Sequence, residues 1–224
     1  MAISDWPEDQ RPRERLITYG PEALTDPELM AIFLRTGSSG KSAIELAKDI
    51  IARFGSLNKL FAANPQEFTG IKGLGPAKLA LLRAVLELAR RTYCEELKTG
   101  PVIQSTLAVK KFLQLHFAGQ QVESFIVLFL DVQHRLIACE KMFEGTLTRT
   151  SVYPREIIRR ALEHNAAAAI FAHNHPSGRP EPSKLDETLT IELKQLMDGI
   201  EVKLLDHIIV SGSLTWSFHE HGLC

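Results

Sequence analysis

Cysteine is scarce in this chain, and the three that occur, Cys94, Cys139 and Cys224, form no CxxC pair. This sparse, odd set fits free thiols in a reducing cytosol better than it fits a disulfide framework. No apolar run approaches the roughly 18 residues of a membrane span, which argues against a transmembrane protein. Residues 1–15 are polar and lack the apolar core of a secretory signal. We therefore expect a soluble, cytoplasmic protein.

An excess of charge of either sign is also absent. The chain carries 26 Lys and Arg against 27 Asp and Glu, a formal net charge of −1. Residues 1–100 hold 14 basic and 13 acidic side chains, which leaves 12 and 14 in the remainder. Bulk charge therefore gives no support to nucleic-acid binding, and only a local basic patch could provide it. With 45% hydrophobic residues, the chain can bury the core of one large or two small domains.

Helical patterns with short breaks occupy residues 1–95, which we interpret as a small all-α domain. Within it, the glycine-rich sequence GIKGLG leads into a longer helix and resembles a helix-hairpin-helix motif. Gly73 and Gly75 would let the backbone approach a phosphate, and Lys72 and Lys78 would add positive charge beside it. Non-specific DNA binding through these four residues is one hypothesis. The alternative is a tight turn in a helical hairpin, or a module that contacts protein.

The segment 94–102 has neither periodicity nor apolar density, so we place a linker there and a second domain over residues 102–224. The doubly apolar run SFIVLFL near the start of this domain is typical of a central strand. Strands mixed with helices predict an α/β or α+β domain. The expected strands are 124–130, 135–140, 142–150, 166–172, 201–211 and 213–218, and the expected helices are 106–117, 153–165 and 183–197.

A short stretch after the apolar run 166–172 carries the residues with the clearest chemistry. Side chains alternate along a strand, so His173 and His175 point to one side. A loop rich in proline and glycine follows, and Ser183 and Asp186 then open a helix. Two imidazoles and a carboxylate can hold Zn²⁺ and leave its fourth position to water. The net charge near +1 at such an ion would acidify this water.

Each part of this constellation also has a simpler interpretation. The Ser183-x-x-Asp186 pattern is close to a capping box, in which the hydroxyl and the carboxylate satisfy free backbone N–H groups. A His-x-His pair after a strand can consist of surface histidines. The letters HNH invite comparison with a nuclease motif, but that motif spreads its residues over a hairpin and a helix, so we set it aside.

The spacing His-x-His, seven residues, Ser, two residues, Asp resembles the JAMM (MPN+) metalloprotease signature, with His173, His175, Ser183 and Asp186 at its four positions. Within that superfamily, the chain resembles the bacterial RadC family over essentially its whole length. The segments that carry this resemblance are HNHPSG (173–178), VYPRE (152–156) and LDHI (205–208). The resemblance implies a mixed sheet flanked by helices, a zinc-dependent hydrolase of peptide or isopeptide bonds, and an association by name with DNA repair.

A water activated by the metal needs a nearby base to take its proton and return it to the leaving amine. By resemblance to the JAMM family, this base is a glutamate at the edge of an early strand. Glu123 is the expected match because it directly precedes the SFIVLFL run, with Glu140 and Glu144 as rivals. The serine of the signature, Ser183, would stabilise the tetrahedral oxyanion and could cap its helix as well.

The remaining polar residues near these motifs have weaker assignments. Asn174 should point away from the ion and is expected to be structural. Asp206 and His207 could orient a ligand imidazole, or they could be a satisfied buried pair. The second His-x-His, at His219 and His221, has no acidic partner after a loop, so we expect both histidines at the surface.

Two functions follow from these observations. The first is a zinc-dependent amidohydrolase of the JAMM type that acts on a peptide or protein substrate. The second is a DNA-binding or DNA-processing accessory protein, in which the helical domain carries the function and the metal is structural. In a combination of the two, the helical domain would recruit the protein to DNA and the second domain would cut.

Overall fold

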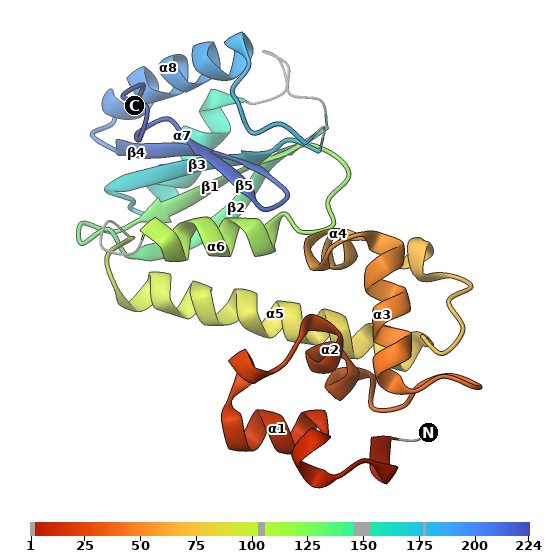
Figure 1. The fold of residues 1–224 in the computed structure, drawn as a ribbon. Helices are drawn as coiled ribbons and strands as arrows, with labels where there is room; N and C mark the ends of the chain where they lie inside the picture. Colours follow the sequence, from red (N-terminus) through yellow and green to blue (C-terminus); the bar gives the residue numbers. More distant parts are fainter. Residues whose placement is uncertain (1–2, 103–105, 146–152, 177) are drawn as a thin grey trace. The chain divides into compact units, whose positions relative to one another are not determined.

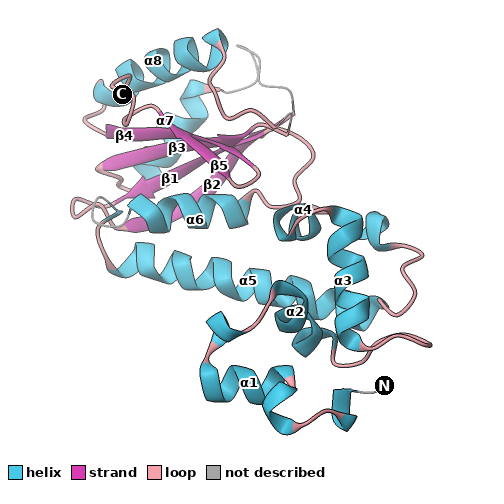
Figure 2. Cartoon of the chain, in the orientation of Figure 1, coloured by secondary structure: helices cyan, strands magenta, loops and turns pink. Residues whose placement is uncertain are grey.

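The computed structural model describes residues 3–102, 106–145, 153–176 and 178–224 (Figures 1 and 2). The chain divides into two compact units, of which the first ends at Leu86 and the second begins at Glu87. The division falls within helix α5 (Pro76–Thr99). Residues 94–99, expected to lie in a linker, are helical instead because Leu97 is buried in the core of the second unit. The domain limits 1–95 and 102–224 stay a prediction.

The first unit is built from helices, as predicted. Its core gathers apolar side chains from several helices, among them Met30, Leu46, Ile50, Leu60 and Leu82. Besides the start of α5, the unit contains α1 (Pro12–Tyr19), α2 (Asp26–Leu34), α3 (Ala43–Phe54) and α4 (Leu57–Ala62), with short 3-10 turns at Ile3–Asp5, Glu8–Gln10, Pro21–Ala23 and Pro65–Phe68.

Local sequence signals explain the ends of these helices, and α3 is the clearest example. The Ser42 hydroxyl accepts a hydrogen bond from the Glu45 N–H at 3.2 Å, and the Glu45 carboxylate accepts one from the Ser42 N–H at 2.7 Å. This reciprocal capping box satisfies backbone donors that the first turn leaves free. The helix ends at Gly55, whose left-handed backbone (φ 81°) suits glycine because no Cβ opposes it.

The second unit contains a mixed sheet, as the resemblance implied, and the described residues contribute five strands to it. The strand order is β2-β1-β3-β4-β5, and every neighbouring pair is antiparallel except β3 and β4. The strands expected at 135–140 and 142–150 form a single strand as far as Glu144, and residues 146–150 lie outside the described part of the chain. The strands are β1 (Ser124–Leu130), β2 (Leu136–Glu144), β3 (Ala168–Asn174), β4 (Lys203–Ser211) and β5 (Leu214–Ser217).

Helices cover both faces of this sheet (Figure 1). The end of α5 and α6 (Thr106–His116) pack on one face, and α7 (Pro154–Glu163) and α8 (Lys184–Asp198) pack on the other. Every residue of β1 is therefore buried, as its doubly apolar sequence predicted. Its side chains alternate, so that Phe125, Val127 and Phe129 face α7 and α8 while Ile126, Leu128 and Leu130 face α6.

Within the described residues, no helix has both the length and the apolar composition needed to span a bilayer. The cytoplasmic location stays a prediction.

Candidate metal centre

The two histidines of the signature lie at the carboxyl end of β3, which runs between β1 and β4 in the middle of the sheet. His173 is fully buried. His175 follows the strand, where its N–H donates to the Val210 carbonyl at 2.8 Å and its carbonyl accepts from the Ser211 hydroxyl at 2.9 Å. Strand β4 therefore holds the backbone of His175, while its imidazole remains 13% exposed.

The structure brings His173, His175 and Asp186 together. The two Nε2 atoms of the histidines are 2.9 Å apart. His173 Nε2 lies 3.3 Å from Asp186 Oδ1, and His175 Nε2 lies 3.6 Å from Asp186 Oδ2. The side chains that the sequence assigned to one ion thus converge on one point, at the junction of β3 and the first turn of α8.

Asp186 is oriented by the start of α8. Its Oδ2 accepts hydrogen bonds from both the N–H and the hydroxyl of Ser183, each at 2.7 Å, and the Ser183 Oγ accepts one from the Asp186 N–H at 3.2 Å. The capping box considered for this pair is therefore present. The capping box is compatible with a role of Asp186 as a metal ligand. Ser183 binds Oδ2 of the carboxylate, and Oδ1 still faces His173.

Electrostatics distinguish the three side chains. Burial lowers the pKa of His173 to about 4, against the opposing charge of Asp186. Burial also acts to lower the pKa of His175, but hydrogen bonds to Asp186 and to the Arg179 carbonyl raise it above its ordinary value. Burial acts to raise the pKa of Asp186, but His175, His173 and Ser183 together bring it well below its ordinary value. At neutral pH His173 is therefore neutral and Asp186 is ionised, while His175 holds its second proton more tightly than an ordinary histidine does.

The donor set fits a zinc ion. His175 Nδ1 lies 2.9 Å from the Arg179 carbonyl, which can only accept, so the neutral ring carries its lone pair on Nε2. That lone pair faces His173 Nε2 and the Asp186 carboxylate. A tetrahedral zinc with bonds of about 2.0–2.1 Å would separate its ligand atoms by about 3.3 Å. The observed distances of 2.9, 3.3 and 3.6 Å bracket that value.

Glu123 lies across from His175 in the register of the sheet. Phe125 pairs with His173 in the antiparallel ladder of β1 and β3. Because the two strands run in opposite directions, Glu123, two residues before Phe125, lies opposite His175, two residues after His173. Side chains two apart share a face, which places Glu123 on the side of the two histidines. Its negative charge contributes to the raised pKa of His175. Glu123, the candidate base, therefore lies beside the three candidate ligands without belonging to their group.

The rival glutamates are engaged elsewhere. Glu140 accepts hydrogen bonds from the guanidinium of Arg160 on α7, and its Oε1 lies 2.7 Å from His164 Nε2. Glu144 forms an ion pair with Lys141 and is more than half exposed. Neither interaction involves His173, His175 or Asp186.

Asn174 has the structural role expected of it. Its Oδ1 accepts the Ser124 N–H at 2.8 Å, and its Nδ2 donates to the Val122 carbonyl at 3.1 Å. These bonds hold the backbone on both sides of Glu123. Asn174 therefore fixes the position at which the candidate base leaves the sheet.

Asp206 and His207, considered together from the sequence, have different roles. The Asp206 carboxylate accepts from the Ser217 hydroxyl at 2.6 Å and from the His219 N–H at 2.9 Å, so it organises the end of β5. His207 Nε2 lies 2.8 Å from His173 Nδ1, so of the two residues it is His207 that contacts the imidazole of a candidate ligand. His219 and His221 are exposed, as expected.

Sequence reasoning missed Thr190. Its hydroxyl lies 2.6 Å from His207 Nδ1, on the far side of that ring from His173. Thr190 follows Asp186 by one helical turn, so both side chains lie on the same face of α8. That four-residue spacing is the signal that could have identified it.

The residues assigned to a helix-hairpin-helix motif have mixed environments in the first unit. Lys78 Nζ donates to the Thr36 carbonyl at 2.5 Å and to the Gly37 carbonyl at 3.2 Å, and burial lowers its pKa. A Cβ on Gly73 would lie 2.6 Å from Ser38 Cβ, so this glycine serves close packing. Lys72 and Gly75 are exposed. Their role in DNA binding stays a prediction.

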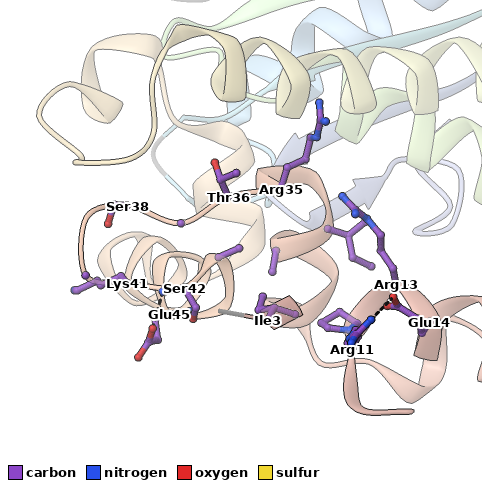
Figure 3. A pocket seen from close by; sticks show the side chains of 16 residues that line it. Ile3, Arg11, Arg13, Glu14, Arg35, Thr36, Ser38, Lys41, Ser42 and Glu45 are labelled. Atoms are coloured by element: carbon purple, nitrogen blue, oxygen red, sulfur yellow. Dashed lines mark hydrogen bonds and ion pairs between the residues drawn. The ribbon is translucent and has the colours of Figure 1, made fainter. Parts of the chain in front are cut away.

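A cavity of about 750 Å³ opens on the same unit (Figure 3). Both carboxylates of its lining are engaged, because Glu14 pairs with Arg11 at 3.8 Å and Glu45 caps α3. The side chains of Arg13 and Arg35 are exposed. The lining is therefore richer in available positive charge than the chain as a whole.

Two protein families match the chain: the RadC-like JAB domain over residues 103–223 and the UPF0758 N-terminal domain over residues 3–80. A UPF0758 protein of Herminiimonas arsenicoxydans is 60% identical over 222 residues, which cover 99% of both chains. UPF0758 proteins of Janthinobacterium sp. (strain Marseille) and Nitrosomonas eutropha are 60% and 56% identical, over 99% and 100% of both chains. These names carry no statement of activity. The resemblance read from the histidine motif is confirmed, and the chain belongs to the UPF0758 family of proteins with a RadC-like JAB domain.

Proposed function

We propose that this protein is a zinc-dependent hydrolase of the JAMM type that cleaves a peptide or isopeptide bond. The observation that carries the proposal is the convergence of His173 Nε2, His175 Nε2 and the Asp186 carboxylate at 2.9–3.6 Å. Two imidazoles and one carboxylate are a ligand set that zinc takes in catalytic sites, where a fourth position stays open. Membership of the RadC-like JAB family supports the same class of chemistry.

Zinc held by these residues would act as a Lewis acid that lowers the pKa of a water and polarises a carbonyl. Glu123 would accept the proton of that water and return it to the leaving amine. Its place opposite His175 supports this role, because a base must lie within reach of the attacking water. The choice of an amide as the bond cleaved rests on the resemblance to the JAMM metalloproteases.

Ser183 would stabilise the negative charge that develops on the carbonyl oxygen of the substrate. Its hydroxyl donates to Asp186 Oδ2 at 2.7 Å, so it must rotate to reach a substrate. The Ser183 N–H donates to the same oxygen and would keep the Asp186 carboxylate in place during that rotation. The same residue would then both cap α8 and contact the reacting group.

Metal content and hydrolysis, measured on the full chain, test the proposal together. The zinc-loaded protein should contain one ion per chain by plasma mass spectrometry and should cleave members of a fluorogenic panel of peptides and lysine isopeptides. Glu123→Gln should retain the ion and lose at least about a hundredfold in kcat. Its matched control is Glu144→Gln, at an exposed position paired with Lys141, which should retain both properties.

A wild-type chain that binds no zinc would refute the proposal. Stoichiometric zinc without cleavage of any panel member would instead favour a structural metal. Undiminished hydrolysis in Glu123→Gln would show that another group acts as the base.

The alternative, a DNA-binding accessory protein, is favoured by one observation. Lys72 is exposed, and the same unit carries exposed Arg13 and Arg35 at its cavity. Contacts to phosphates would give an affinity that falls steeply with salt. Anisotropy of a labelled duplex should then show weaker binding and a salt slope reduced by roughly one in Lys72→Ala. Absence of any binding at low salt would refute this function.

A further inference from the structure

A buried chain of hydrogen bonds leads away from the candidate metal centre. It starts at His173 Nδ1, which lies 2.8 Å from His207 Nε2. The other ring nitrogen of His207 lies 2.6 Å from Thr190 Oγ1, and that hydroxyl donates to the Asp186 carbonyl at 2.6 Å. His173, His207 and Thr190 are each at most 1% exposed. The chain thus connects β3, β4 and α8 and returns to the residue that supplies the carboxylate.

The direction of every proton in this chain follows from counting donors and acceptors. A carbonyl oxygen can only accept, so the single hydroxyl proton of Thr190 points to Asp186. The hydroxyl oxygen must then accept from His207, which places the His207 proton on Nδ1. The neutral His207 ring has its lone pair on Nε2, so His173 donates from Nδ1. The lone pair of His173 is left on Nε2, the atom that faces His175 and Asp186.

The surroundings of His207 favour a neutral ring with two hydrogen bonds. Phe218 stacks on it at 4.8 Å between centroids with an interplanar angle of 9°, and Phe125 and Phe171 meet it edge-on at 5.6 and 6.1 Å. A charged imidazole in such an apolar setting would lose its hydration without compensation. A doubly protonated His207 would also present N–H groups to both neighbours and could not accept from His173.

We propose that His207 and Thr190 are positioning residues that hold His173 in its Nδ1–H tautomer, with the Nε2 lone pair aimed at the metal position. The part of this proposal that concerns metal rests on the proposed function, whereas the tautomer is a property of the protein itself. A ligand imidazole commonly donates its second N–H to an outer partner that fixes its tautomer and orientation. Here that partner is an imidazole, and its own tautomer is set in turn by a threonine.

These hydrogen bonds also connect two of the candidate ligands, His173 and Asp186, through His207 and Thr190. Thr190 binds the carbonyl of Asp186, while Ser183 binds its carboxylate. A change that removes the Thr190 hydroxyl would free His207 to move its proton to Nε2. A proton on His207 Nε2 would point at the N–H of His173, and two donors cannot share one hydrogen bond. His173 would then favour the tautomer with its proton on Nε2, and this protonated nitrogen cannot bind a metal.

Long-range ¹H–¹⁵N spectroscopy of the metal-free, full-length wild-type protein tests the tautomers directly. The expected result is a proton on Nδ1 and a lone pair on Nε2 for both His173 and His207. A proton on Nε2 of His173 would overturn the proposal. This measurement needs no variant and no enzymatic activity.

Metal affinity tests the consequence, with Co²⁺ followed by its visible absorption. Thr190→Val keeps the shape of the side chain without the hydroxyl and should weaken binding roughly 10- to 100-fold. Thr190→Ser is the matched control that keeps the hydroxyl, and it should bind within about threefold of wild type. His207→Phe removes the acceptor and should weaken Co²⁺ binding at least as much as Thr190→Val does.

The outcomes separate this proposal from the proposed function. Equal Co²⁺ affinities in Thr190→Val and Thr190→Ser would overturn the positioning role, whether both are normal or both are weak. A wild-type chain that binds no metal would refute the hydrolase, while the ¹⁵N spectrum would still decide the tautomers. Loss of Co²⁺ affinity in the valine variant alone, with the expected wild-type spectrum, would support the positioning role even if no peptide is cleaved.

Discussion

Lowering the pH from about 6.5 to about 5.5 is expected to weaken zinc binding roughly five- to tenfold, through one proton on His175. The pKa of His175 lies above its ordinary value of 6.5, so a proton competes with the metal for Nε2 throughout this range. The pKa of His173 is about 4, and the pKa of Asp186 lies well below its ordinary value. These two groups therefore remain almost fully deprotonated and contribute little.

The size of the effect follows from the competition at one site. If the pKa of His175 were 6.5, one pH unit would lower the apparent affinity by a factor of about 5.5, and the factor approaches ten as the pKa rises. The folding stability of the metal-free protein depends on pH in the opposite direction to its zinc affinity, so it increases as the pH falls. The raised pKa of His175 means that its protonated form stabilises the fold. That stabilisation is complete below pH 6.5 and is lost as the pH rises through the raised pKa.

Isothermal titration of the metal-free protein with zinc, in buffers of different ionisation enthalpy, measures the protons released. At about pH 5.5 the expected release is close to one proton per zinc from protein side chains, and it should fall toward zero well above the pKa of His175. The matched control is His219→Gln, which removes an exposed histidine and should leave the profile unchanged. Release of two protons at about pH 5.5 would show that His173 is also protonated, and release of none would show that His175 is not; either result would refute the assignment.

Four further outcomes are expected. Ser183→Ala removes the cap of α8 and should cost about 1 kcal/mol, a fall of roughly 2–4 °C in Tm by calorimetry; an unchanged Tm would contradict the cap. Gly37→Ala should destabilise the first unit by about 1–3 kcal/mol in urea unfolding, because its Cβ would meet the Lys41 carbonyl oxygen; a neutral result would show that this turn rearranges. Lys78→Met should cost about 1–3 kcal/mol and Lys72→Met less than about 0.5 kcal/mol, and equal costs would contradict the buried role of Lys78. Zinc at a hundredfold excess over its Kd should add about 2.7 kcal/mol, which EDTA should remove; an unchanged Tm would contradict specific binding.

The sequence by itself determined the features that depend on neighbours in the chain. Alternation along β3 places His173 and His175 on one side, and the Ser183-x-x-Asp186 spacing starts α8 with its carboxylate turned inward. The run of apolar residues in β1 predicted a strand buried on both faces, because successive side chains in a strand point to opposite faces and both sets are apolar here. Segment type and the identity of the three candidate ligands could therefore be read without a structure.

Only the tertiary structure decided which distant side chains meet. The register of β1 against β3 places Glu123 opposite His175, and packing of α7 occupies Glu140 through Arg160. The contact between His207 and Thr190 likewise requires β4 and α8 to lie together. Pattern reasoning is weak here because each of these residues has several compatible partners, and strand order and helix packing select one of them.

The same cause explains two environments that the local sequence did not reveal. Residues 94–99 look irregular by composition, yet they continue α5 because Leu97 inserts into the core of the second unit. Lys78 has the charge expected of a phosphate contact, yet its ammonium binds the carbonyls of Thr36 and Gly37, more than 40 residues earlier in the chain. Local chemistry determines what a residue is able to bind, and long-range packing determines which of those partners it reaches.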